Sequence, residues 1–410
     1  MRSITADRCR ATLLIAALAV PVSKARAESL FTLLNSPTSN ATVARGFGAG
    51  ADTWTGMGWS SGSPRGEVWR NGTVTLLENP PDGTGEVMPY GISADGSVVV
   101  GYAGIAGGNY EACRWDDGSP TGLGFLFAGP DTGSYANDVT ADGTVIVGSA
   151  YYVDSSTGDW GGQAFRWEGG VMTGLETVPG AKSSYAADIT PDGTRIVGSI
   201  LSPNRQEACI WTNGVLAPLG GLSDGWLESW ASSASDDGTT IVGIGVRSDG
   251  WHFVRWAGNQ IESIGDLDES LTDGLPEFHP RVSGDGSRII GTSFTAVGTR
   301  NWISVDGSGP QDFATYISLH YGLGGAISGL SIAELGAISP DGRSISGRCY
   351  DADSHEYGFI AYLDPADFTA VPEIDPAGAG AAFALLASAM GIVERRRRGP
   401  RPGPAGYSRP

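Results

Sequence analysis

Two short runs of acidic residues carry side chains that could bind a metal ion. The runs are Asp266-Leu267-Asp268-Glu269 and Asp351-Ala352-Asp353-Ser354-His355-Glu356. Closely spaced carboxylates suit calcium, which takes about six to eight oxygen ligands. Neither run has the glycine and the ligand spacing of an EF-hand loop, so a solvated loop is the simpler interpretation. We therefore expect no metal or cofactor, with calcium at either run as the alternative.

The candidate bases and nucleophiles give weaker signals. Four histidines, His252, His279, His320 and His355, show no metal-ligand spacing and none stands beside a plausible nucleophile. Cys113, Cys209 and Cys349 form no CxxC motif, so we expect buried thiols that act as small apolar residues. We predict no catalytic residue. A carboxylate pair for glycoside hydrolysis stays open, because such a pair is defined only in three dimensions.

Arginines and aromatic residues are the remaining candidates. Arg114, Arg166 and Arg255 each precede a tryptophan. They could ring a channel and bind acidic sugars, but repetition at one position favours local pairing with a turn Asp or a neighbouring unit's carbonyl. Seven aromatic residues outside the repeat pattern could stack on sugar rings, although some must be core: Trp54, Trp59, Tyr151, Tyr152, Trp160, Trp226 and Trp230.

A repeat positions all of these residues. The pattern Ser/Thr-x-Asp-Gly-x4-Gly returns six times, and its Asp-to-Asp steps are 47, 50, 45, 48 and 56 residues. The six turns are Asp95-Gly96, Asp142-Gly143, Asp192-Gly193, Asp237-Gly238, Asp285-Gly286 and Asp341-Gly342. A fixed period of this size marks a repeat architecture. Residues that recur in every unit build the scaffold, so these aspartates are structural rather than catalytic.

Each unit reads as four short antiparallel strands. We expect a type I′ hairpin turn at Asp-Gly, because Asp tolerates and Gly favours left-handed geometry. A β-branched residue four positions after the Asp faces a packed layer, and the Gly two positions later permits close backbone approach. A degraded seventh unit around Glu67–Gly72 precedes the six. The prediction is an all-β propeller of about seven four-stranded blades. Residues 30–34 should join the last blade, which lacks a fourth strand of its own.

The two ends of the chain predict sorting rather than fold. Residues 1–27 have the basic start, apolar run and small-x-small site of a secretory signal peptide, with Ala25, Ala27 and Glu28 at the cleavage site. Residues 28–366 form the propeller and 367–376 a linker with a sorting motif. Residues 377–393 are apolar, long enough at the lower limit for a transmembrane helix. Residues 394–410 form a basic tail that we expect to be disordered and cytoplasmic.

The C-terminal segment resembles the PEP-CTERM sorting signal of bacteria that make exopolysaccharide. Its parts match in order: Val371-Pro372-Glu373, then Asp375-Pro376, then an apolar helix, then Arg395, Arg396, Arg397 and Arg398. Ile374 stands where the family usually has Pro. The resemblance implies recognition by an exosortase-type membrane transpeptidase and removal of the tail. A permanent single-span anchor is the alternative.

The repeat itself resembles the HAF family of extracellular repeats. Val99-Val100-Gly101, Phe165-Arg166-Trp167 and Leu219-Gly220-Gly221-Leu222 match the strand and turn segments of that family. The Ser339–Gly342 turn also resembles TolB-type propeller repeats. The HAF family carries no assigned catalytic residues, so the resemblance implies a scaffold and no chemistry.

The composition of the chain limits the classes of molecule that the protein can bind. The whole chain has a net charge of −19, and residues 28–370 hold 15 basic and 41 acidic residues. A body this acidic argues against nucleic acid as a partner. We expect a monomeric, surface-sorted protein that binds or organises extracellular material such as polysaccharide, without catalysis. A secreted propeller enzyme acting on glycans, or a spacer without a ligand, are the alternatives.

Overall fold

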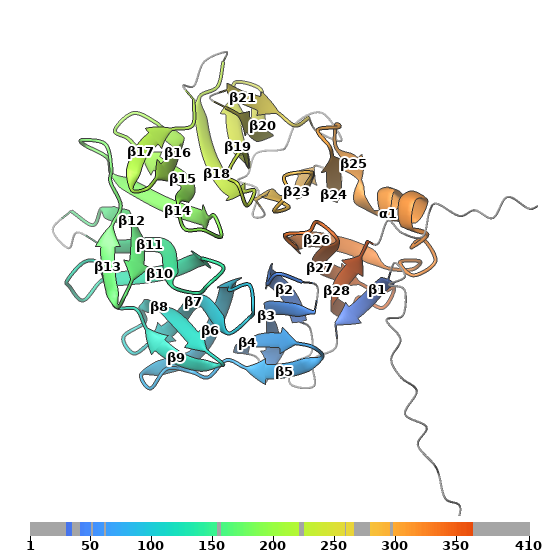
Figure 1. The fold of residues 1–410 in the computed structure, drawn as a ribbon, viewed down its shortest axis with the longest axis horizontal. Helices are drawn as coiled ribbons and strands as arrows, with labels where there is room; N and C mark the ends of the chain where they lie inside the picture. Colours follow the sequence, from blue (N-terminus) through green and yellow to red (C-terminus); the bar gives the residue numbers. More distant parts are fainter. Residues whose placement is uncertain are drawn as a thin grey trace, which may run out of the picture.

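The chain forms a seven-bladed β-propeller, and each blade is a four-stranded antiparallel sheet (Figure 1). The computed structural model describes residues 30–34, 42–50, 52–60, 63–153, 157–220, 225–258, 260–265, 279–295 and 298–363. The predicted fold class is confirmed, including the blade count. Among the described residues no helix is long and apolar enough to cross a membrane. The signal peptide, the sorting motif and the apolar run 377–393 lie outside the described residues.

Blades 1 to 4 follow the chain, each with strands in consecutive order from the centre outward. Blade 1 contains β2 (Thr42–Phe47), β3 (Thr53–Ser60), β4 (Ser63–Arg70) and β5 (Thr73–Leu76). Blade 2 contains β6 (Gly83–Ile92), β7 (Val98–Ile105), β8 (Tyr110–Asp116) and β9 (Ser119–Gly122). Blade 3 contains β10 (Thr132–Val139), β11 (Val145–Val153), β12 (Trp160–Glu168) and β13 (Val171–Gly174). Blade 4 contains β14 (Ser183–Ile189), β15 (Arg195–Leu201), β16 (Gln206–Thr212) and β17 (Val215–Pro218).

Blades 5 to 7 complete the circle. Blade 5 contains β18 (Glu228–Ala234), β19 (Thr240–Arg247), β20 (Gly250–Ala257) and β21 (Gln260–Ser263). Blade 6 contains β22 (Arg281–Val282), β23 (Arg288–Thr295), β24 (Gly298–Val305) and β25 (Gln311–Asp312). Blade 7 contains β26 (Ser331–Ile338), β27 (Ser344–Tyr350), β28 (Glu356–Tyr362) and the N-terminal β1 (Leu30–Leu34). The helix α1 (Phe313–Tyr321) follows β25, and it occupies part of the longest repeat step.

The N-terminal strand closes the propeller, as the sequence predicts. β1 pairs antiparallel with β28, from Leu30 opposite Tyr362 to Leu34 opposite Gly358. Phe31 also stacks on Phe359 with ring centroids 4.8 Å apart. Because one blade contains both ends of the repeat region, opening the ring requires breaking this strand pair.

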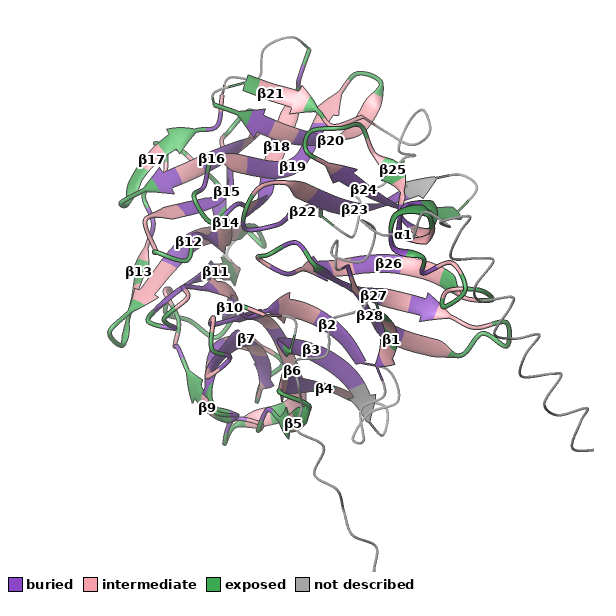
Figure 2. Cartoon of the chain, turned by 45° about the vertical axis from the view of Figure 1, so that its right-hand side comes forward, coloured by how far each residue is buried: buried purple, intermediate pink, exposed green. Residues whose placement is uncertain are grey.

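Apolar contacts join each blade to its neighbours. The described residues form seven buried clusters, one at each junction between blades. The repeated β-branched residue is buried in all six units, as predicted: Val99, Ile146, Ile196, Ile241, Ile289 and Ile345. Figure 2 shows the buried strands in the body of the blades and the exposed outer strands, such as β13 and β17. Cys113 and Cys209 are buried free thiols in different clusters, and Cys349 is a third buried free thiol.

Each Asp-Gly turn is held by one hydroxyl and one carboxylate. In the first, Ser93 Oγ donates to Asp95 Oδ1 at 2.9 Å and accepts from the Val98 backbone N–H at 3.0 Å. Asp95 Oδ1 also accepts from the backbone N–H of Ser97. The same three bonds recur at the other five turns, with Thr in place of Ser at two of them.

The expected type I′ geometry at these turns is wrong. The Gly96 N–H donates to the Ser93 carbonyl, so Ala94 and Asp95 occupy the centre of the turn. Gly96 alone enters the left-handed region, with φ of 74°, while Asp95 does not. Since the carboxylate of Asp95 is bonded to the turn, the Asp acts as a cap and leaves the left-handed position to Gly. Positive φ at both central residues occurs instead before the fourth strand, as at Asn213-Gly214.

The repeated glycine of the second strand faces a bulge on the inner strand. In blade 3 the pairing shifts between Ala136 and Asp138, and Gly148 lies opposite Ala136. A Cβ at Gly148 would overlap the Tyr135 carbonyl oxygen. The same close approach occurs in five other blades, at Gly56, Gly101, Gly198, Gly243 and Gly347. The glycine therefore permits the bulge, and the bulge sets which side chains reach the centre.

Replacing Gly148 with alanine should therefore destabilise the fold by about 3 kcal/mol or more, because the new methyl group meets backbone rather than a flexible side chain. Thermal unfolding of Gly148→Ala measures this effect. Gly309→Ala is the matched control, since a Cβ there meets nothing within 4 Å and needs no left-handed backbone. Equal unfolding temperatures for the two variants would show that the close approach has no energetic consequence.

Candidate functional site

The candidate site is the central channel, a cavity of about 1010 Å³ lined by the inner strands of all seven blades. The bulges turn two consecutive side chains of an inner strand toward the channel, as at Asn137-Asp138 in blade 3. The cavity has the size of a site for a small ligand. Its chemistry depends on which side chain each blade contributes.

One ring of lining positions breaks the sevenfold regularity. Each blade contributes one of these positions, two residues before the Ser or Thr of its turn. Blade 1 has no such turn and contributes the matching position. We call these seven positions the deep tier. From blade 1 to blade 7 they are Gly46, Gly91, Asp138, Asp188, Ser233, Arg281 and Ala337. Polar side chains therefore occupy blades 3 to 6, and small residues occupy blades 7, 1 and 2. At this depth the channel therefore has a side of polar residues and a side of small residues, and Arg45 and Glu334 line the cavity at other positions on the second side.

Two carboxylates of the deep tier share one environment. Asp138 Oδ2 and Asp188 Oδ1 both accept from the Ile189 backbone N–H, at 3.0 and 2.9 Å. Asp188 Oδ2 accepts from the Ala234 N–H at 2.8 Å. Burial and the adjacent Asp188 raise the pKa of Asp138 well above its ordinary value. The Asp138 carboxyl therefore keeps its proton to a higher pH than a free aspartic acid does.

The opposite end of the polar wall carries two basic residues, a charged arginine and a histidine. His279 and Arg281 line the cavity in blade 6, and Arg281 Nη1 donates to the Ser232 carbonyl at 3.2 Å. Enclosure by the channel walls and the Arg281 charge lower the pKa of His279 to about 4. The imidazole is therefore neutral at pH 7. Tyr185 lies on the same cavity with 46% of its surface exposed.

A row of six aromatic rings leads away from the channel across blades 2 and 3. The row consists of Tyr90, Tyr102, Tyr110, Tyr135, Tyr151 and Trp160, and we call it the aromatic row. Its ring centroids are 4.9 to 5.9 Å apart from one ring to the next. Tyr90 and Tyr135 line the cavity, and Trp160 at the other end is 70% exposed. Among these, Tyr102 and Tyr135 have a raised phenol pKa, chiefly because of burial.

The sequence candidates divide between this site and the scaffold. Tyr151 and Trp160 belong to the row, whereas Trp54 and Trp226 are buried core residues. Tyr152 contacts Phe127 instead, and Trp230 packs against Trp251. The side chain of Trp59 lies outside the described residues. Of the seven aromatic candidates, Tyr151 and Trp160 therefore lie on the candidate site, and their role in binding stays a prediction.

The three arginines pair locally, as their repetition predicts. Arg114 donates to the Gly143 carbonyl of the next blade and pairs with Asp116. Arg166 donates to the Gly193 carbonyl at 3.1 Å and pairs with Glu168. Arg255 pairs with Glu262 at 3.0 Å. A ring of these arginines around the channel is therefore wrong.

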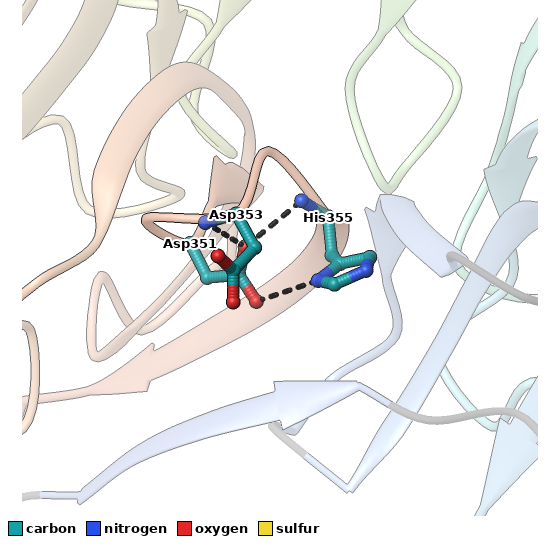
Figure 3. Close-up of side chains that lie close together, drawn as sticks. All are labelled: Asp351, Asp353 and His355. Atoms are coloured by element: carbon teal, nitrogen blue, oxygen red, sulfur yellow. Dashed lines mark hydrogen bonds and ion pairs between the residues drawn. The ribbon is translucent and has the colours of Figure 1, made fainter.

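The acidic run at 351–356 forms a compact loop (Figure 3). Ligand atoms of Asp351, Asp353 and His355 lie within 4.8 Å of one another. Asp351 Oδ1 accepts from the backbone N–H groups of Asp353 and His355, both at 2.9 Å, and Oδ2 bonds to His355 Nδ1. These bonds explain the cluster as a loop cap. The run 266–269 lies outside the described residues.

Sequence reasoning missed the deep tier and the inner tyrosines. Aligning the six turns places Asp138, Asp188 and Arg281 in one column, whose residue types differ from unit to unit. That irregular column, beside a regular motif, was the available signal. The sequence alone does not show that these side chains face the channel. A regular strand alternates its side chains between two faces, and the bulge changes that alternation.

The fold and the channel define the class of this protein as a seven-bladed β-propeller with an irregular central site. No protein-family model matches the chain, and no curated protein matches it. Among solved structures, an oligogalacturonate lyase in complex with manganese is 12% identical, over 83% of this chain and 98% of that chain, with a TM-score of 0.53.

Two further solved structures were found in the same comparison. An oligogalacturonate lyase from Vibrio parahaemolyticus is 10% identical over 83% of this chain and 98% of that chain, with a TM-score of 0.54. TolB from Acinetobacter baumannii is 17% identical over 54% of this chain, with a TM-score of 0.37, and the chain spans about half of it, 53%. At such identities the likeness to the two lyases shows the fold alone.

The carboxylate pair predicts a pH-dependent stability. Because the folded pKa of Asp138 is raised above the unfolded value of about 3.9, its contribution is present below about pH 4 and is lost as pH rises through the folded pKa. Asp138→Asn keeps an acceptor for Ile189 N–H and cannot ionise. Its unfolding temperature relative to wild type should rise by several degrees between about pH 4 and about pH 8. A difference in unfolding temperature that stays the same at all pH values would contradict the raised pKa of Asp138.

Proposed function

We propose that this protein is an extracellular, non-catalytic propeller that binds polysaccharide through the aromatic row and the central channel. The aromatic row carries the proposal, because flat rings with one polar edge suit the apolar faces and the hydroxyl groups of sugars. Its rings are partly accessible, and Trp160 is exposed. A buried core role would not leave a tryptophan at 70% exposure.

The channel supports binding more than cleavage. Asp138 and Asp188 are the paired carboxylates of the deep tier, and both already accept backbone N–H bonds from the next blade. They are thus used to join blades 3, 4 and 5. The alternative, a propeller enzyme that cleaves glycans, would use other carboxylates of the cavity, such as Asp236, as its acidic groups.

The cellular setting rests on the ends of the chain. The HAF-like repeat, the signal peptide at 1–27 and the PEP-CTERM-like tail at 371–398 together indicate export and sorting at the cell surface. The partner for that step would be an exosortase-type transpeptidase. Surface placement brings the aromatic row into contact with extracellular polysaccharide. The strongly acidic body agrees with solubility in this setting.

Binding should depend on the exposed end of the row. Titration calorimetry of the full-length protein with a panel of extracellular polysaccharides measures the affinity. Trp160→Ala and Tyr151→Ala should each weaken the best binder about tenfold, which corresponds to ~1.4 kcal/mol.

Tyr152→Ala is the matched control for that titration. Tyr152 is adjacent in sequence and 38% exposed, but its ring contacts Phe127 and not the row. This variant should keep wild-type affinity. The absence of binding to every polymer would reject the proposal, and shortened products on chromatography would favour the enzyme alternative.

Sorting is tested by the mass of the mature chain. Intact-mass spectrometry of the protein isolated from the cell surface should give an N-terminus at Glu28 and a C-terminus near Glu373–Pro376. Replacing Val371, Pro372 and Glu373 with alanine should retain the tail. A wild-type chain that is intact through Pro410 would contradict processing and support a permanent anchor.

A further inference from the structure

We propose that the channel binds the free end of a neutral glycan chain, with the terminal sugar against the deep tier and the following sugars on the aromatic row. This inference rests on the proposed function, and it adds the part of the polymer that is recognised and its charge class. Three features of the described residues support it: continuity between row and cavity, the unequal residues of the deep tier, and a ring of turns at the far end of the channel.

The row and the cavity form one continuous surface. Tyr90 and Tyr135 belong to both, since they line the cavity and also lie 5.9 and 4.9 Å from the Tyr102 ring. Tyr135 then leads to Tyr151, and Tyr151 leads to Trp160, in steps of 5.5 and 5.7 Å. Each step is comparable to the length of one pyranose ring. A chain lying on the row therefore has its end at the channel.

The deep tier can hold one polar unit against one wall. Asp138, Asp188, Ser233 and Arg281 supply polar groups on neighbouring blades. The facing deep-tier positions, Gly46, Gly91 and Ala337, are small, and Arg45 and Glu334 line the cavity on that side at other positions. A terminal sugar offers more hydroxyl groups than an internal one, since one linkage is absent. A wall of hydrogen-bonding groups facing open space matches that terminal unit better than a chain passing through.

The far end of the channel is encircled by backbone. The second residue of each turn, or its counterpart in blade 1, lines the cavity: Ala49, Ala94, Ala141, Pro191, Asp236, Gly284 and Pro340. Five of the seven neighbouring pairs are joined by backbone hydrogen bonds of 2.7 to 3.1 Å. The other two pairs would need an N–H donor at Pro191 or Pro340, which proline lacks. These turns bound the far end of the channel, and in the proposed arrangement a chain that enters from the row ends beside them.

The charges of the cavity favour a neutral glycan. Six acidic residues line it: Asp138, Asp188, Asp236, Asp285, Glu334 and Asp341. Only two arginines line the same cavity: Arg45, beside Glu334, and Arg281, which is bonded to a carbonyl. A polyuronate would bring a further carboxylate for every sugar and would be repelled. The neutral His279 and the raised pKa of Asp236 and Tyr185 agree with a wall that works through hydrogen bonds.

Blocked oligosaccharides test the end-on arrangement. Linear neutral hexasaccharides of glucose, xylose and galactose are titrated against the full-length protein beside hexagalacturonate. The tightest neutral binder is then modified in two ways, with a bulky fluorophore at the reducing end or with a benzylidene acetal at the non-reducing end. One modification should weaken binding at least tenfold, and the other should have little effect.

Two variants separate the deep tier from the row. Arg281→Gln should weaken binding. It should also remove the difference in affinity between the blocked and the unblocked hexasaccharide, because the terminal sugar loses a hydrogen-bonding partner in the deep tier. Tyr151→Ala should weaken binding while the tenfold effect of the block remains. Unfolding temperatures equal to wild type show that both variants are folded.

Each remaining outcome overturns a defined part of the account. Equal affinity for both blocked and unblocked glycans would reject end recognition while leaving polysaccharide binding intact. Tighter binding of hexagalacturonate than of every neutral hexasaccharide would reject the neutral class. Failure of all the oligosaccharides and all the polysaccharides to bind would reject the inference together with the proposed function.

Discussion

The whole architecture depends on one small network, the hydroxyl–carboxylate contact inside each Asp-Gly turn. Ser93 Oγ connects Asp95 to the Val98 N–H, and this unit recurs in six blades. This network fixes where the inner strand of a blade ends and where the second strand of the same blade begins. The turn backbone then bonds to the neighbouring turn at five of the seven junctions, so local order extends around most of the ring. Hydrogen bonds to the carboxylates lower the pKa of Asp142 and Asp192, so these contacts strengthen above the acid range.

The same turns determine the site indirectly. A fixed strand end with a bulge two residues before it places a side chain at one depth in the channel, in blade after blade. The scaffold leaves the residue type at that depth free to vary. Asp138, Asp188 and Arg281 occupy equivalent places with different chemistry, and small residues occupy the facing blades. A regular repeat thus carries an irregular site, because the repeat constrains the backbone and not the inward side chain.

The sequence was sufficient for the blade count, the strand exchange through Leu30–Leu34 and the burial of Ile146 and its equivalents, since periodicity and residue type report these directly. It was insufficient for the turn type, because the carboxylate of Asp95 bonds to its own turn and leaves Gly96 as the left-handed residue. The helix α1 and the deep tier were also missed. Both depend on tertiary packing, and the inward direction of Asp138 follows from a bulge that no local pattern announces.

The central claim is that one asymmetric surface, from Trp160 to the deep tier, binds a single glycan chain. A crystal structure of the protein with a bound neutral hexasaccharide tests it most directly. The account predicts continuous sugar density over Tyr151 and Tyr135, ending beside Asp138, Asp188 and Arg281. Density confined to an outer blade surface, with the channel free of sugar, would contradict it.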